Sequence, residues 1–187
     1  MFESIKLAEY EWFLWLNSFH TPFWDTAMYW ISHRYTWIPL YLILIIFTFR
    51  EDKKEFAKRI LMAILAVGLA DYTASGILKP YFQRLRPCHD PIIQNLVHVV
   101  GNCGGQFGFA SSHAANSFAL ATIFILFYYK KNKMMASLMP WAIIVSYSRI
   151  YNGVHYPTDI LVGAIIGILS AFLFYSIYKR LKPIKND

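Results

Sequence analysis

The chain has 187 residues, a length typical of one domain, and 57% of them are hydrophobic and 18% aromatic. A mean hydropathy of +0.36 excludes an ordinary soluble domain. The net charge of +7 is gathered in three short segments, which argues against a nucleic-acid-binding protein. We therefore predict an all-α membrane domain that occupies residues 1–187.

The first segment of the chain is expected to lie in the membrane interface. Residues 4–18 set Trp12 and Trp15 among charged residues, a pattern typical of an amphipathic interfacial helix. Acidic residues come early and no basic region precedes an apolar core, so the sequence does not predict a cleavable signal peptide. A short helix is expected over 22–34, where Thr21 and Pro22 form an N-cap and N1 pair.

The rest of the chain is dominated by apolar runs. They cover residues 36–49, 60–78, 114–129, 134–147 and 160–178. A membrane helix needs about 20 mainly apolar residues, so 60–78 and 160–178 qualify alone and the others qualify as members of a bundle. With 22–34 counted as a short span, we predict a bundle of six transmembrane helices with both termini on one side. With 22–34 re-entrant, the number is five.

Basic residues indicate how the bundle is oriented. They cluster in three segments: Arg50, Lys53, Lys54, Lys58 and Arg59; Lys130, Lys131 and Lys133; and Lys179, Arg180, Lys182 and Lys185. The positive-inside rule makes these segments cytoplasmic, together with both termini. Segments 79–112 and 149–157 then share the opposite face, which is the periplasm or the exterior if the membrane is a bacterial inner membrane.

Three polar clusters fall on this opposite face. They are Lys79, Arg84, Arg86 and His89; Ser111, Ser112 and His113; and Arg149, His155 and Asp159. An ionisable group at membrane depth costs about 2.5–3.5 kcal/mol on insertion scales, so such groups usually mark function. One cation alone is explained equally well by snorkelling to the interface, and one serine pair by helix capping. The coincidence of all three clusters predicts a functional site.

The chemistry of these residues suits a phosphate group. Lys79, Arg86 and Arg149 would repel one another unless an anion lay between them, and guanidinium groups bind phosphate oxygens in pairs. Ser111 and Ser112 are predicted to cap a helix whose free N–H groups also face an anion. We therefore expect all five residues to bind the phosphate of the substrate.

Two histidines add reactive groups. The spacing of His155 and Asp159 allows the carboxylate to orient one imidazole nitrogen and leave the other free as a nucleophile. His113 is suited to protonating a leaving oxygen. The pattern indicates phosphoryl transfer through a phosphohistidine. A structural hydrogen bond or a metal site are the alternatives for the His155–Asp159 pair, and the three cations disfavour a metal.

These residues carry a resemblance to the type-2 phosphatidic acid phosphatase superfamily. The family pattern is K-x6-R-P, then P-S-G-H, then S-R-x5-H-x3-D. Lys79 with Arg86-Pro87 matches the first part, and Ser148-Arg149 with His155 and Asp159 matches the third. The second part differs from the family's P-S-G-H, because residues 110–113 read Ala-Ser-Ser-His. The resemblance covers residues 60–178.

The resemblance implies a role for each matched residue. His155 would attack phosphorus, Asp159 would orient it, and His113 would protonate the leaving group and later activate water. Lys79, Arg86, Arg149 and Ser111 would hold the phosphoryl oxygens without a metal or other cofactor. The superfamily also includes vanadium haloperoxidases, but those relatives are soluble and this apolar chain is not expected to be. The resemblance therefore implies a membrane phosphatase.

Other residues carry weaker expectations. Asp71, Arg84 and Ser148 are candidates for contacting and positioning the residues that bind the phosphate. For Asp71 a buried structural pair is an equal alternative. Cys88 and Cys103 enclose 14 residues of one outer loop, and in an oxidising compartment a disulfide is expected. Gly163 and Gly167 predict close helix packing within the bundle rather than a dimer interface. The four glycines of the 88–110 loop fit either a lid or tight turns.

The predicted function is hydrolysis of a phosphate monoester or pyrophosphate on a lipid of the surrounding membrane. The candidate substrates are undecaprenyl pyrophosphate, phosphatidylglycerol phosphate, phosphatidic acid and a lipid A phosphate. A phosphotransferase with the same site is the first alternative. An anion channel or transporter is the second, but the helices that follow the polar layer carry almost no polar residues. The sequence predicts no oligomeric state.

Overall fold

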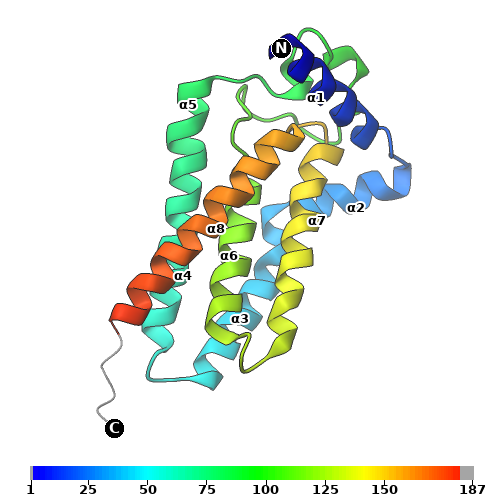
Figure 1. The fold of residues 1–187 in the computed structure, drawn as a ribbon. Helices are drawn as coiled ribbons and strands as arrows, with labels where there is room; N and C mark the ends of the chain where they lie inside the picture. Colours follow the sequence, from blue (N-terminus) through cyan, green and yellow to red (C-terminus); the bar gives the residue numbers. More distant parts are fainter. Residues whose placement is uncertain (1, 182–187) are drawn as a thin grey trace.

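The computed structural model describes residues 2–181, and within them it contains helices and loops but no strand (Figure 1). The α-helices are α1 (Phe2–Asn17), α2 (Pro22–Ser32), α3 (Ile38–Glu51), α4 (Phe56–Asp71), α5 (Lys79–Phe82), α6 (Ser112–Tyr128), α7 (Leu138–Tyr151) and α8 (Pro157–Arg180). A π-helical segment, Tyr72–Leu78, joins α4 to α5 without a break. The predicted all-α fold is confirmed.

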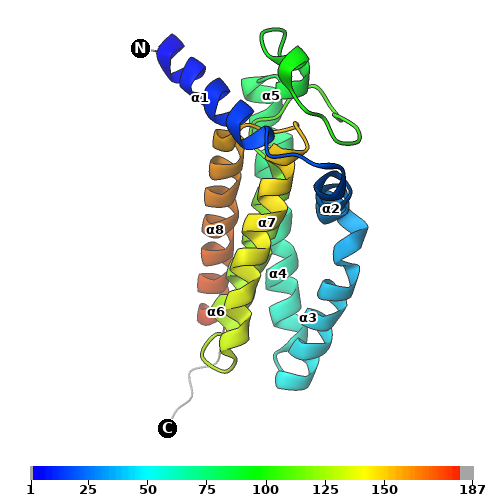
Figure 2. The same ribbon diagram turned by 90° about the vertical axis from the view of Figure 1, so that its right-hand side faces the viewer.

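The bundle is built around α6, which packs against α4, α7 and α8 (Figure 2). Small residues let α6 and α8 approach closely. A Cβ atom added at Gly163 would lie 2.4 Å from the Ser111 carbonyl oxygen, and one at Gly167 would lie 2.2 Å from that of Ala115. The prediction that these glycines serve packing within the bundle is therefore confirmed, and this contact fixes the start of α6 against α8.

Within residues 2–181, two helices are long and apolar enough to cross a membrane, Phe56–Phe82 and Pro157–Arg180. The bent pair Pro22–Ser32 and Arg34–Glu51 passes the same test only when counted together, and its two parts meet at 67°. The remaining helices of the bundle are shorter. The structure thus supports two or three spans by length and composition, and the number six stays a prediction.

The first and last helices end at opposite ends of the bundle. Helix α1 lies at one end of the bundle and α8 terminates at the other (Figure 1). Helix α2 runs across the bundle axis rather than along it, and an 11-residue helix is about 16 Å long, half of a bilayer core. The expectation that both termini lie on one side of the membrane stays a prediction.

The basic segments, as far as the structure describes them, and the polar clusters lie at opposite ends, as the sequence predicts; Lys182 and Lys185 lie outside the described residues. The α3–α4 loop, the α6–α7 loop and the end of α8 lie together at the lower end in Figure 1. In that layer Arg59 is buried and contacts the Asp52 carboxylate at 3.2 Å and the Tyr178 hydroxyl at 2.9 Å. The opposite end is covered by α1 and the loops that carry the candidate site.

Candidate active site

The centre of the site is a buried pair formed by His155 and Asp159. Nδ1 of His155 lies 3.2 Å from Oδ2 of Asp159, and both side chains are at most 1% exposed. Asp159 is the third residue of α8 because Pro157 starts that helix, and it also accepts the N–H of Tyr156 at 3.0 Å. Within the described residues no hydrogen bond occupies Nε2 of His155. The carboxylate therefore orients a ring whose second nitrogen is free.

The surroundings of His155 keep its ring neutral. Burial lowers its pKa well below the ordinary value of 6.5. The positive charges of Arg149, Arg86 and Lys79 lower the pKa further, in that order. A neutral imidazole has a lone pair on Nε2, so this environment suits a nucleophile. The same three cations are those predicted to hold a phosphate.

Arg86 is positioned by the loop that follows it. Its Nη1 donates to the Cys103 carbonyl oxygen at 2.9 Å and its Nε to that of Phe107 at 3.2 Å. A disulfide joins Cys88 to Cys103, with Cα atoms 6.3 Å apart, as the sequence predicts. Backbone carbonyls of this loop and of Phe107 therefore hold the guanidinium, and no ion pair with a carboxylate is formed by Arg86 within residues 2–181.

Lys79 and the start of α6 form the next part of the site. Ser111 caps α6, since its Oγ accepts the N–H of Ala114 at 3.4 Å, and it is fully buried. Ser112 accepts a hydrogen bond from Lys79 Nζ at 3.4 Å. His113 follows on the first turn of the same helix. The predicted cap is thus at Ser111, while Ser112 is the first helical residue.

Arg149 approaches from α7 and is held by a residue that sequence analysis did not single out. Its Nη1 donates to the hydroxyl of Ser32, at the end of α2. Its Nε is buried and has no hydrogen-bond partner among the described residues. Ser148, the neighbour predicted to support the site, instead donates to the Val145 carbonyl oxygen of its own helix at 2.7 Å.

Arg84 lies behind the His155–Asp159 pair. Its Nη1 contacts the second oxygen of Asp159 at 3.0 Å and its Nη2 contacts Glu9 of α1 at 2.5 Å. The guanidinium also lies over the Tyr156 ring, 4.1 Å from its centroid. The structure thus brings Arg84 to the carboxylate, as expected of a supporting residue. Glu9 was not predicted, because nothing in the sequence of α1 points to this contact.

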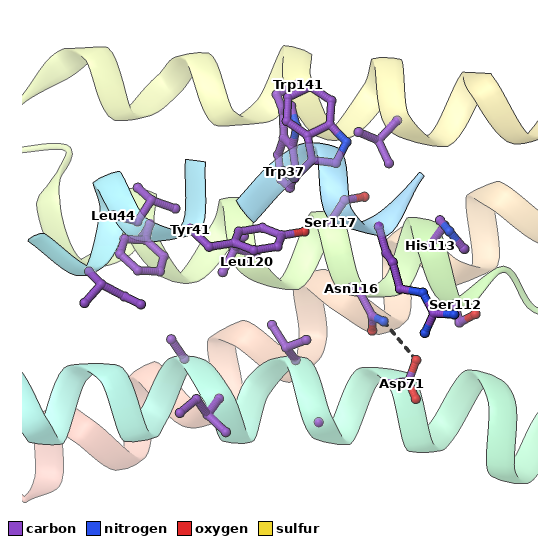
Figure 3. A pocket seen from close by; sticks show the side chains of 18 of the residues that line it. Trp37, Tyr41, Leu44, Asp71, Ser112, His113, Asn116, Ser117, Leu120 and Trp141 are labelled. Carbon is purple, nitrogen blue, oxygen red and sulfur yellow. Dashed lines mark hydrogen bonds between the residues drawn. The ribbon is translucent and has the colours of Figure 1, made fainter. Parts of the chain in front are cut away.

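Asp71 does not pair with Lys79. Its Oδ1 accepts a hydrogen bond from Nδ2 of Asn116 at 2.8 Å (Figure 3). The segment between Asp71 and Lys79, Tyr72–Leu78, is π-helical and has more residues per turn than an α-helix. Asn116 was missed, although an amide one helical turn after His113 in an apolar run is a usable signal.

A groove of about 880 Å³ runs from this end of the bundle along α3, α4, α6 and α7. His113, Ser112, Asp71 and Asn116 lie toward one end of it in Figure 3, and Tyr41, Leu44 and Leu120 toward the other. The walls are mostly apolar, and the groove begins beside the histidine predicted to protonate the leaving group. Its shape suits a molecule with a phosphorylated head and an apolar tail.

The group of side chains with metal-ligand spacing lies in the disulfide-closed loop and not at the His155–Asp159 pair. Among residues 2–181, the one group with metal-ligand spacing is Cys88, His89 and Cys103. The two sulfurs are joined to each other, so neither offers a thiolate. His89 lies in the same loop, with Nε2 3.5 Å from the Gly104 carbonyl oxygen, and it does not reach His155 by any contact in the described residues.

The fold and the site define a class: a helical membrane protein with two histidines beside a cluster of cations at the mouth of an apolar groove. The chain matches the model of the PAP2 superfamily over residues 57–183. It is 37% identical over 184 residues to a lipid A 4′-phosphatase of Bacteroides thetaiotaomicron, which covers 97% of this chain and 81% of the relative. It is 34% identical to the lipid A 4′-phosphatase of Porphyromonas gingivalis, covering 94% of this chain and 75% of that one.

Solved structures agree with the fold. The crystal structure of Aquifex aeolicus LpxE superimposes with a TM-score of 0.69 and 28% identity, over 89% of this chain and 93% of that chain. A phosphatidylglycerolphosphate phosphatase of Bacillus subtilis gives a TM-score of 0.74 at 23% identity, over 97% and 90% of the two chains. The protein belongs to the PAP2 superfamily and is a membrane phosphatase of that family.

Proposed function

We propose that the protein is a lipid phosphatase that removes the 4′-phosphate of a lipid A-type glycolipid through a phosphohistidine on His155. The observation that carries the mechanism is the buried His155–Asp159 contact of 3.2 Å, which leaves Nε2 of His155 free. The choice of lipid is supported by the 37% identity to a lipid A 4′-phosphatase across nearly the whole chain.

The reaction follows from the roles of the two histidines. Nε2 of His155 forms a bond to phosphorus while the bond from phosphorus to the lipid oxygen breaks. His113 gives that oxygen a proton, so a lipid alcohol leaves. Neutral His113 then takes a proton from water, which attacks the phosphohistidine, and inorganic phosphate is released with His155 restored. Asp159 stabilises the positive ring in both steps.

The phosphoryl oxygens are to be held by Lys79, Arg86, Arg149 and the start of α6. The Lys79 amine and the two guanidiniums are donors only, and neither arginine is paired with a carboxylate within the described residues. Such donors stabilise the charge that develops on the transferring group. Their combined positive charge also opposes a divalent cation at the same place, so we propose catalysis without a metal.

The lipid tail is to lie in the apolar groove that begins at His113. We propose that the site faces the periplasm or the exterior of a bacterial inner membrane. The basic loops at the far end of the bundle support that orientation under the positive-inside rule. With an odd number of spans, α1 would then lie on the same outer side as the site.

The experiment measures phosphate release by purified protein in detergent with EDTA. The panel holds lipid A, phosphatidic acid, phosphatidylglycerol phosphate and undecaprenyl pyrophosphate, and each lipid is run with His155→Ala alongside. We expect EDTA-resistant release that is fastest from lipid A and absent in the variant. Activity that appears only when an acceptor alcohol is added would instead favour a phosphotransferase. Release that survives in His155→Ala would overturn the mechanism.

A further inference from the structure

The polar pair Asp71–Asn116 has no role in the mechanism above, yet it lies in the wall of the groove beside the site. Asp71 comes from α4 and Asn116 from α6, and Figure 3 shows both between His113 and the apolar end of the groove. Asn116 is three residues after His113, so the two side chains leave neighbouring turns of one helix face. A group joined to the phosphate at His113 would therefore meet this pair next.

Each residue of the pair has one oxygen that accepts no hydrogen bond from the described residues. A carboxylate only accepts hydrogen bonds, so the Asn116 atom that faces Asp71 at 2.8 Å is its NH2 group. Oδ1 of Asn116 is then the remaining carbonyl oxygen, and it is buried with no hydrogen-bond partner among the described residues. Oδ2 of Asp71 likewise accepts no hydrogen bond within residues 2–181. Both residues line the groove, and the pair has two oxygens that no donor among the described residues reaches.

The opposite wall is aromatic. Trp37 and Trp141 also line the groove, in edge-to-face contact with ring centroids 5.4 Å apart, and Tyr41 lies further along. Figure 3 shows the indoles across the groove from Asp71. Aromatic rings facing a carboxylate and an amide suit a group that is apolar on its faces and carries N–H or O–H donors at its edge. A sugar ring has this character, whereas a diacylglycerol has ester acceptors and no donor.

We propose that Asp71 and Asn116 form a subsite for the N-acylated sugar of the substrate, accepting hydrogen bonds from its amide N–H or hydroxyl groups. This inference rests on the proposed function and names the feature of the lipid that the groove selects. The pair discriminates against lipids that have no hydrogen-bond donor at this position. A glycerol lipid such as phosphatidic acid leaves both acceptors unpaired, and an unpaired buried acceptor disfavours that complex.

The test compares kcat/KM for lipid A and for phosphatidic acid in three variants. Asn116→Leu removes the free acceptor, and we expect it to lower kcat/KM on lipid A by roughly 10- to 100-fold while leaving phosphatidic acid within about twofold. Asp71→Asn keeps an oxygen for Asn116 and should give a smaller loss. Ser117→Ala is the matched control, because that hydroxyl lines the groove but donates to the Ala114 carbonyl oxygen at 3.2 Å; both lipids should be unaffected.

A second measurement tests the subsite without requiring that lipid A be the substrate. Phosphate-free lipid A is added as an inhibitor of p-nitrophenyl phosphate hydrolysis. We expect Asn116→Leu to weaken this inhibition about tenfold or more and Ser117→Ala to leave it unchanged. If the wild-type protein does not hydrolyse lipid A but is inhibited in this pattern, the proposed function fails and the subsite stands. An equal loss on both lipids, or unchanged inhibition in Asn116→Leu, would overturn the subsite.

Discussion

Glu9 and Asp159 are joined by one guanidinium, that of Arg84, although one lies on the N-terminal helix and the other on the last. Arg84 contacts Glu9 at 2.5 Å and Asp159 at 3.0 Å. Glu9 also accepts a hydrogen bond from the hydroxyl of Thr158, beside Asp159 in α8. Helix α1 is thereby tied to the carboxylate that orients the proposed nucleophile.

Loss of this link should slow the reaction without weakening substrate binding. We expect Glu9→Gln to lower kcat by about tenfold with little change in KM, because Arg84 loses an anchor and Asp159 shifts relative to His155. Arg84→Ala should cost more than Arg84→Lys. The matched control is Glu11→Gln, since Glu11 is exposed on the same helix. Equal kcat in the Glu9 and Glu11 variants would contradict this role.

Close packing of α6 on α8 gives a prediction about stability. Gly163→Ala would press a methyl group against the Ser111 carbonyl oxygen, at 2.4 Å in the present geometry. We expect the free energy of unfolding in detergent to fall by about 1–3 kcal/mol, and activity to fall because Ser111 starts the helix that carries His113. Gly68→Ala is the control, because nothing lies within 4 Å of its added Cβ and alanine favours helix. A stable Gly163→Ala protein would contradict the packing argument.

The Cys88–Cys103 disulfide should matter for phosphate binding as well as for stability. Loss of the loop closure costs about 3 kcal/mol in the entropy model, and the Cys103 carbonyl oxygen that holds Arg86 is freed. We therefore expect Cys88→Ser with Cys103→Ser to raise KM several-fold, and dithiothreitol to do the same to the wild-type protein. The double variant should not respond to dithiothreitol. Unchanged KM after complete reduction, verified by thiol counting, would be the contrary result.

The pKa of His155 can be followed directly. Since burial lowers that pKa below 6.5, the folded protein keeps the ring neutral where an ordinary histidine gains a proton. On acidification the unfolded chain binds this proton first, so His155 contributes a loss of stability as the pH falls below about 6.5. Histidine-labelled protein studied by NMR should show its signal, assigned with His155→Gln, still neutral at pH 6. A His155 signal that titrates at or above pH 6.5 would show that the site does not lower the pKa of this histidine.

Much of the site was predictable because its chemistry is local in sequence. Lys79 and Arg86 lie in one segment, and the His155–Asp159 contact follows from a proline that starts α8 between them. Ser111 was expected as a cap and is one. These features depend on neighbours a few residues apart, for which sequence spacing fixes geometry.

The residues that were missed come from long-range packing. Glu9 and Ser32 reach the site because the whole bundle places α1 and α2, and no local pattern indicates either residue. Asn116 meets Asp71 because α4 and α6 pack together, although its place one turn after His113 in an apolar run was a local signal. Asp71 pairs with Asn116 of another helix, a partner that the sequence around Asp71 does not indicate. The number of spans was hard to predict since α2 is apolar enough to resemble a span but runs across the bundle.

The most direct test of the account is to trap the proposed intermediate. Purified protein is mixed with substrate carrying a ³²P-labelled phosphate, quenched in alkali within milliseconds and digested for mass spectrometry. We predict an acid-labile, alkali-stable phosphate on the peptide that contains His155. With a substrate whose leaving group needs no protonation, His113→Ala should accumulate more label, because His113 is the proposed base for hydrolysis of the intermediate. Turnover without label on that peptide, or label that persists in His155→Ala, would contradict it.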